Sequence, residues 1–199
     1  MIDLRNASFI GPPQSDPKTM AKLPPELRDL LVTANGFIVF GGGLHVRGVC
    51  DVPDWHSLNR VWTGDHALAQ LYAAVRPDDI PFAQDFLGDQ FLLRSGLVIR
   101  LSGETGEIED TGLDLMLFLD SAQENPDRFL SLGLLRQFER DDGPLEPGKL
   151  LSVYPPLCCK EAADGASLRA ISAMERIGFL ADFARQISSA ADGTRIRFT

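Results

Sequence analysis

The sequence predicts an α+β domain, with a curved, mainly antiparallel sheet flanked by N-terminal and C-terminal helices. Short apolar runs at residues 91–93, 97–101 and 107–109, separated by turn chemistry, predict an antiparallel meander. Apolar residues at helical spacing follow Pro24 and recur between residues 173 and 188. Helices at both ends of a central meander are typical of the α+β class.

We expect one domain over residues 1–199, because the length and the 44% hydrophobic content suit a single core. Residues 1–22 have no sustained period and predict an N-terminal arm. A helix should run from Pro24 to the Asn35-Gly36 stop, and strands are expected at 37–40 and 44–47.

The remaining elements follow from caps and periodicity. Residues 51–79 predict a helical insertion, with Asp65 capping a helix whose apolar positions begin at Leu68. A helical region is expected over 113–138, interrupted by a fresh cap at Asn125. Residues 143–199 read as a C-terminal extension packed on the core. Within it, Ser172 and Glu175 form a capping-box pattern, and alternation at 194–198 predicts an edge strand.

The charge is concentrated in the middle of the chain. Overall, 19 Lys and Arg stand against 28 Asp and Glu, a net charge of -9, and residues 78–127 hold 12 acids against Arg94 and Arg100, or -10. Nucleic-acid backbones attract basic clusters, so we expect no nucleic-acid partner. No apolar run approaches the ~20 residues of a membrane span, and the N-terminus does not resemble a secretion signal. We therefore expect a cytoplasmic protein with no membrane partner.

No pattern points to catalysis. Residues 143–149 resemble part of a phosphate-binding loop, but Leu150 stands where the Mg²⁺-binding hydroxyl should be. The chain has no Gly-x-Ser-x-Gly elbow, and its three cysteines form no Cys-x-x-Cys pair. One short span holds residues of metal-ligating type without a recognised spacing: Cys50, Asp51, Asp54, His56, Asp65 and His66. The sequence thus predicts no enzyme, no metal and no cofactor.

Three segments, in this order, resemble the SUKH superfamily, which includes the Smi/Knr-type cell-wall-assembly regulator domain. They are residues 23–27, the Asn35-Gly36 stop, and residues 80–93 with Gly88-Asp89. The likeness extends over about residues 23–130. It implies a curved sheet with flanking helices and a non-catalytic role, commonly that of a bacterial immunity protein that neutralises a toxin domain. The insertion at 51–79 and the long C-terminal extension depart from this pattern.

Acidity and resemblance together predict a protein-binding module that captures a basic partner, such as a nuclease toxin, through an acidic surface. Two aromatic residues in the insertion could anchor a partner as well. The candidate partner-binding residues are Asp85, Asp89, Glu104, Glu107, Glu109, Asp110, Trp55 and Trp62. The alternatives are a regulatory scaffold that forms a homodimer through the tryptophans, and a metal-dependent or small-molecule enzyme built on the region from His45 to His66.

Overall fold

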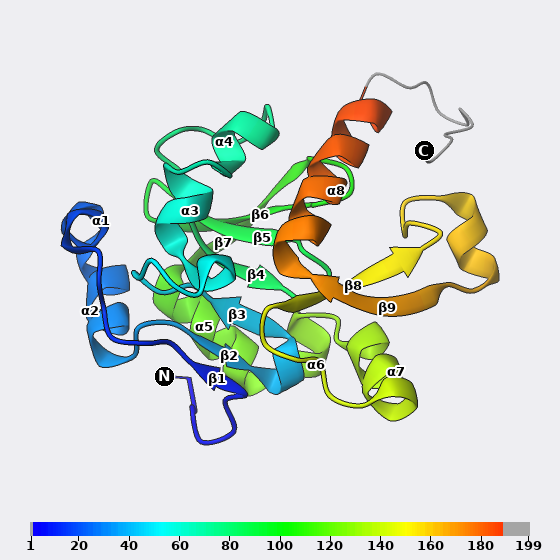
Figure 1. The fold of residues 1–199 in the computed structure, drawn as a ribbon, viewed down its shortest axis with the longest axis horizontal. Coiled ribbons are helices and arrows are strands. Elements are labelled where there is room, and N and C mark those ends of the chain that lie inside the picture. The colour runs from blue at the N-terminus through cyan, green and yellow to red at the C-terminus, as the bar shows by residue number, and fades with distance from the viewer. Residues whose placement is uncertain (1, 189–199) are drawn as a thin grey trace.

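The computed structural model describes residues 2–188 and centres on a seven-stranded antiparallel sheet (Figure 1). Neighbouring strands in the sheet are also consecutive along the chain, so the sheet is a meander. Its strands are β1 (Phe9–Ile10), β2 (Phe37–Val39), β3 (Leu44–Val46), β4 (Ile80–Asp85), β5 (Gln90–Arg94), β6 (Leu97–Leu101) and β7 (Ile108–Asp114). The α+β class is confirmed. A separate two-stranded sheet pairs β8 (Lys149–Tyr154) with β9 (Ser167–Ser172).

Helices surround this sheet, and most are short. They are α1 (Pro17–Lys22), α2 (Pro25–Thr33), α3 (Leu58–Trp62), α4 (Leu68–Leu71), α5 (Leu115–Glu124), α6 (Pro126–Phe129), α7 (Gly133–Asp142) and α8 (Ala173–Ile187), with 3₁₀ turns η1 (Phe40–Gly42), η2 (Asp54–His56) and η3 (Lys160–Asp164). None of the described helices is both long enough and apolar enough to cross a membrane.

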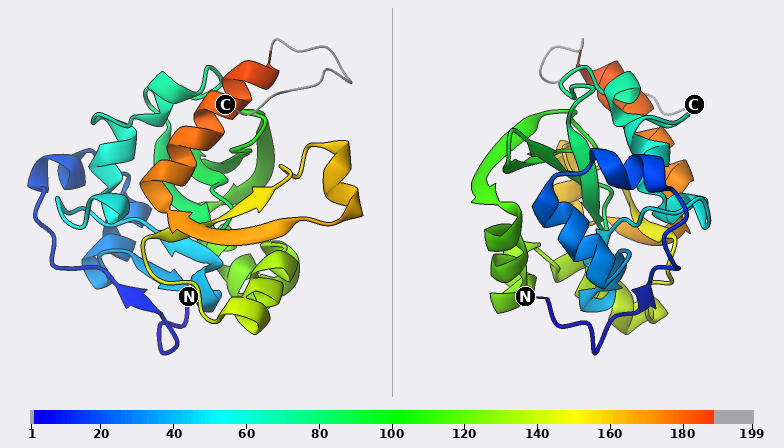
Figure 2. Two further views of the ribbon diagram at one scale, coloured as in Figure 1. Left: turned by 45° about the vertical axis from the view of Figure 1, so that its right-hand side comes forward. Right: turned by 90° about the vertical axis from the view of Figure 1, so that its left-hand side faces the viewer.

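The sheet is covered on both faces. One apolar cluster packs α2, α5 and α7 against one face through Phe91 and Leu93, and a second packs α4 and α8 against the other through Leu92 and Ile99. Figure 2 shows α5 and α8 on opposite sides of the sheet. Because both faces are buried, residues 91–93 in the middle of β5 form an apolar run rather than an alternating pattern.

Local chemistry explains several ends of elements. Asp114 and Asn125 cap α5 and α6, accepting hydrogen bonds from the N–H groups of Leu117 and Arg128. The predicted cap at Asn125 is therefore confirmed. The N-terminal arm contributes β1, which pairs with β2 and so extends the sheet.

Two expected local features differ, and a third cannot be compared. The insertion helix covers only Leu68–Leu71, and its N-cap is Ala67 rather than Asp65. Ser172 does precede α8, but its side chain makes no capping hydrogen bond. The strand expected at 194–198 lies outside the described residues.

Candidate functional site

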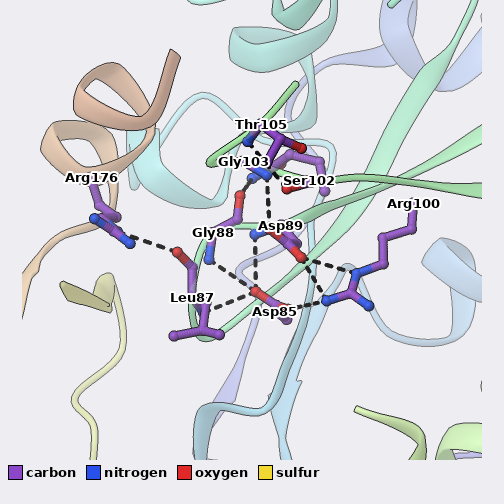
Figure 3. Close-up of polar contacts among 10 residues, drawn as sticks. Asp85, Leu87, Gly88, Asp89, Arg100, Ser102, Gly103, Thr105 and Arg176 are labelled. Atoms are coloured by element: carbon purple, nitrogen blue, oxygen red, sulfur yellow. Dashed lines mark hydrogen bonds and ion pairs between the residues drawn. The ribbon is translucent and has the colours of Figure 1, made fainter. Parts of the chain in front are cut away.

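Asp85 organises the turn between β4 and β5. Its Oδ1 accepts hydrogen bonds from three successive backbone N–H groups, those of Leu87 and Gly88 at 2.9 Å and of Asp89 at 3.0 Å (Figure 3). Gly88 has φ +101°, a conformation in which a side chain would be strained. The Asp85 side chain is only 4% exposed. The prediction that Asp85 faces a partner is therefore wrong, because the turn uses this carboxylate internally.

Asp89 has an internal role as well. Its Oδ2 accepts hydrogen bonds from Arg100 Nη2 at 2.6 Å and Nε at 3.0 Å, and its Oδ1 accepts one from the Gly103 N–H at 2.8 Å. The carboxylate thus ties β6 and the following hairpin loop to the β4–β5 turn (Figure 3). Because Arg100 neutralises it, Asp89 does not belong to a free acidic surface, which corrects the second expectation.

Burial also changes the protonation of Asp85. Removal from water disfavours the charged carboxyl and the nearby Asp89 carboxylate repels it, so the pKa of Asp85 rises to about 7. Arg100, whose Nη2 lies 4.0 Å from Oδ2, and the backbone N–H donors oppose this rise. The charge at Asp85 is therefore sensitive to its surroundings near neutral pH.

Glu104 holds the C-terminal extension. Its Oε1 and Oε2 accept hydrogen bonds from the N–H groups of Leu157 and Cys158, at 3.1 and 3.0 Å, across more than fifty residues of sequence. The buried guanidinium of Arg176, on α8, lies 3.7 Å from Oε1. Glu104 therefore anchors the C-terminal extension to the hairpin instead of facing a partner. This corrects the expectation that it is a partner-binding residue.

Replacing Glu104 tests this fastening. Glu104→Ala removes both acceptors and leaves buried Arg176 without a carboxylate, so we expect a loss of about 2–3 kcal/mol in unfolding free energy. Hydrogen exchange of the Leu157 and Cys158 amides should accelerate. Glu107→Ala, an exposed acid on the same hairpin, is the control and should change neither measurement. Unchanged exchange in Glu104→Ala would contradict the assignment.

Three predicted acids remain at the surface. Glu107, Glu109 and Asp110 are exposed and lie along β7 or immediately before it, and Asp114 ends the same strand. We call these four residues the β7 acidic strip. β7 pairs only with β6, so it is an edge of the sheet. None of the four side chains forms an ion pair with a described residue.

The two tryptophans secure the insertion instead of projecting from it. The half-buried Trp55 ring lies 4.9 Å from that of Phe9 and 5.4 Å from that of His45, and Gly148 approaches so closely that a Cβ there would sit 2.8 Å from its Nε1. Trp62 is half-buried against the main apolar cluster. The structure therefore does not present these rings as partner anchors.

A hydrogen-bonded chain that the sequence did not indicate joins His45 and His56, both buried. His56 Nε2 lies 2.9 Å from the Asn35 carbonyl, so it donates, and His56 Nδ1 therefore accepts from His45 Nε2 at 2.8 Å. His45 Nδ1 then accepts from the Gln84 amide. All four ring nitrogens are engaged only when both imidazoles are neutral.

This arrangement assigns the two histidines to the core. Burial lowers the pKa of His56 to about 4. Burial also lowers the pKa of His45 well below its ordinary value, and the nearby His56 and Arg47 lower it further. The cavity that His45 lines is about 10 Å³, room for about one water. Among residues 2–188, no group of three or more His, Cys, Asp or Glu side chains could hold a metal ion.

Fold and site together define an α+β domain whose seven-stranded meander ends in an acidic edge strand. Its fold is similar to that in the crystal structure of Atu4351 from Agrobacterium tumefaciens, with a TM-score of 0.57 and 11% sequence identity, over 89% of this chain and 86% of that one. This likeness concerns the fold alone. No protein-family model and no curated protein matches the chain.

Proposed function

We propose that this protein is a non-catalytic binding module of the immunity or antitoxin type, which neutralises a basic toxin domain by covering its surface. The observation that carries this proposal is the β7 acidic strip: four exposed carboxylates on a sheet edge, none of which forms an ion pair with a described residue. Carboxylates that do have counter-ions, such as Asp89, stabilise the fold. Within the strip, Asp114 also caps α5 and Asp110 accepts a hydrogen bond from the Gly112 N–H, but all four side chains are exposed to molecules outside the chain.

Electrostatic attraction would raise the rate at which such a module associates with its partner. Complementary potentials raise association rates by about 10- to 1,000-fold at low ionic strength. In about 0.1 M salt, attraction between charges more than about 10 Å apart is largely screened. A nuclease domain carries its positive charge where it holds nucleic acid. A protein that occupies this surface inhibits without chemistry of its own. The other candidate function is a scaffold that self-associates through its tryptophans. Both tryptophan rings are half-buried, which gives this candidate less support.

The proposal predicts that a gene next to that of this protein encodes a toxin domain, and the test uses that domain. Co-expression should rescue cells from that toxin, and stopped-flow association should be fast at low salt. Charge reversal at Glu107, Glu109 and Asp110 to lysine should slow association by about tenfold or more at low salt, and much less in 0.5 M salt.

A matched control separates the strip from net charge. Reversing Glu26, Asp29 and Glu161 changes the total charge equally, and all three are exposed outside β7. This variant should retain most of the association rate. Equal slowing in both variants, or no binding and no rescue by the unaltered protein, would overturn the proposal.

A further inference from the structure

A cavity of about 260 Å³ opens beside the β7 acidic strip. Three phenylalanines contribute to its wall. The Phe118 ring centre lies 4.7 Å from that of Phe91 and 5.3 Å from that of Phe129. Phe91 is buried, whereas Phe129 is 36% exposed, so the aromatic wall extends from the sheet to the surface of α6. Such a wall suits a flat or apolar group that enters from outside.

The polar part of the cavity is predominantly acidic. Glu109 and Asp110 of the strip contribute to its lining, as does the buried carboxyl of Asp85. Asp85 Oδ2 accepts no hydrogen bond from any described residue, and Arg100 Nη2 is 4.0 Å away. Arg100 is the one cation in the lining, and Asp89 already engages it. Asp85 is partly protonated near neutral pH, so the two exposed carboxylates of Glu109 and Asp110 are what favour a cation and repel an anion, against one guanidinium that Asp89 already pairs.

We propose that this cavity is the anchor pocket for an arginine side chain of the basic partner, an inference that rests on the proposed function and deepens it. The stem of the arginine packs along Phe129 and Leu113, the partly exposed apolar residues of the lining, and its guanidinium reaches the carboxylates of Glu109 and Asp110. The unused oxygen of Asp85 offers a further acceptor deeper in the pocket.

Arginine matches this lining better than lysine does. A guanidinium is planar, so it stacks on a phenylalanine face, and it can donate to two carboxylates at once. It is also more weakly hydrated than an ammonium group, so its transfer into a partly apolar pocket costs less. A single buried arginine of this kind is a common centre of a protein interface.

The probe is N-acetyl-arginine amide, titrated against the labelled full-length protein and followed by NMR. We expect saturable shifts of the Thr111 and Leu130 amides, at the cavity, with a dissociation constant on the order of 1–10 mM. N-acetyl-citrulline amide, a neutral isostere, should bind at least about tenfold more weakly because it lacks the charge. Equal binding of both probes, or shifts elsewhere on the surface, would overturn the inference.

Variants locate the contacts. Glu109→Gln combined with Asp110→Asn should weaken the arginine probe about fivefold or more, while Glu26→Gln, an exposed acid on α2 outside the lining and the strip, should leave it unchanged. Phe129→Leu should weaken the probe as well. If the toxin domain binds through the strip but the arginine probe does not bind, the pocket assignment falls and the proposed function stands. If the probe binds but reversal of the strip leaves toxin association unchanged, the proposed function falls.

Discussion

Asp85→Ala should lower the free energy of unfolding by about 3–5 kcal/mol, the largest effect that we expect from a single substitution in this chain. Alanine leaves the N–H groups of Leu87, Gly88 and Asp89 without their acceptor. All three groups belong to the turn between β4 and β5, which packs against α8: a Cβ on Gly88 would lie 2.7 Å from Leu180. Urea unfolding at neutral pH measures the loss.

Two substitutions show that the loss comes from the acceptor. Asp85→Asn retains a carbonyl oxygen of the same geometry, so it should cost at most about 1–2 kcal/mol. Asp110→Ala removes an exposed carboxylate and should change stability by about 0.5 kcal/mol or less. Equal losses for Asp85→Ala and Asp85→Asn would contradict an assignment based on these hydrogen bonds.

The elements that the sequence predicts well are those whose ends are set by neighbouring residues. The strand at 97–101 coincides with β6, and the C-terminal helix begins at Ala173, as expected. The residues that form turns and helix caps lie within three or four positions of one another, so a single sequence shows them together.

Elements with polar residues in unexpected positions escaped prediction. β4 contains Pro81 and buries Gln84 and Asp85, so it does not resemble an apolar or alternating strand. Gln84 lies inside because it joins the chain of hydrogen bonds with Arg47 and His45. Long-range partners decide this placement, and they are invisible to local periodicity.

The sequence predicted only part of the candidate site for the same reason. Composition counts charges but does not show their partners, and Glu104 finds the amides of Leu157 and Cys158 more than fifty residues away. One local signal did exist: Asp85 stands three residues before Gly88, a spacing in which a carboxylate can accept hydrogen bonds from its own turn. Within the β7 strip, Asp110 and Asp114 have similar local roles, accepting hydrogen bonds from the N–H groups of Gly112 and Leu117.

The second large effect concerns acid. The pKa values of His45 and His56 are lowered by folding, so the unfolded chain binds more protons below pH 6.5 and stability falls as the pH drops from 6.5 towards 4. Each histidine contributes a slope of about 1.4 kcal/mol per pH unit within its window, or about 3 kcal/mol in total from His56. Histidine side-chain NMR should show both rings neutral at pH 5 in the folded protein.

Asp85 acts in the opposite direction, and this makes the mechanism testable. Its raised pKa means that the folded state binds the extra proton between pH 3.8 and about 7, so Asp85 favours folding as the pH falls. Asp85→Asn removes this compensation. The unfolding free energy of this variant should therefore fall more steeply from pH 6.5 to 4 than that of the wild type, by a slope that corresponds to about one additional proton taken up on unfolding. His66→Gln, outside the hydrogen-bonded chain, should keep the wild-type slope. Asp16, whose pKa is lowered from 3.8, contributes only at more acidic pH. Stability that does not change between pH 6.5 and 4 in Asp85→Asn would show that the two buried imidazoles accept protons without cost, contrary to the closed chain of hydrogen bonds that holds them.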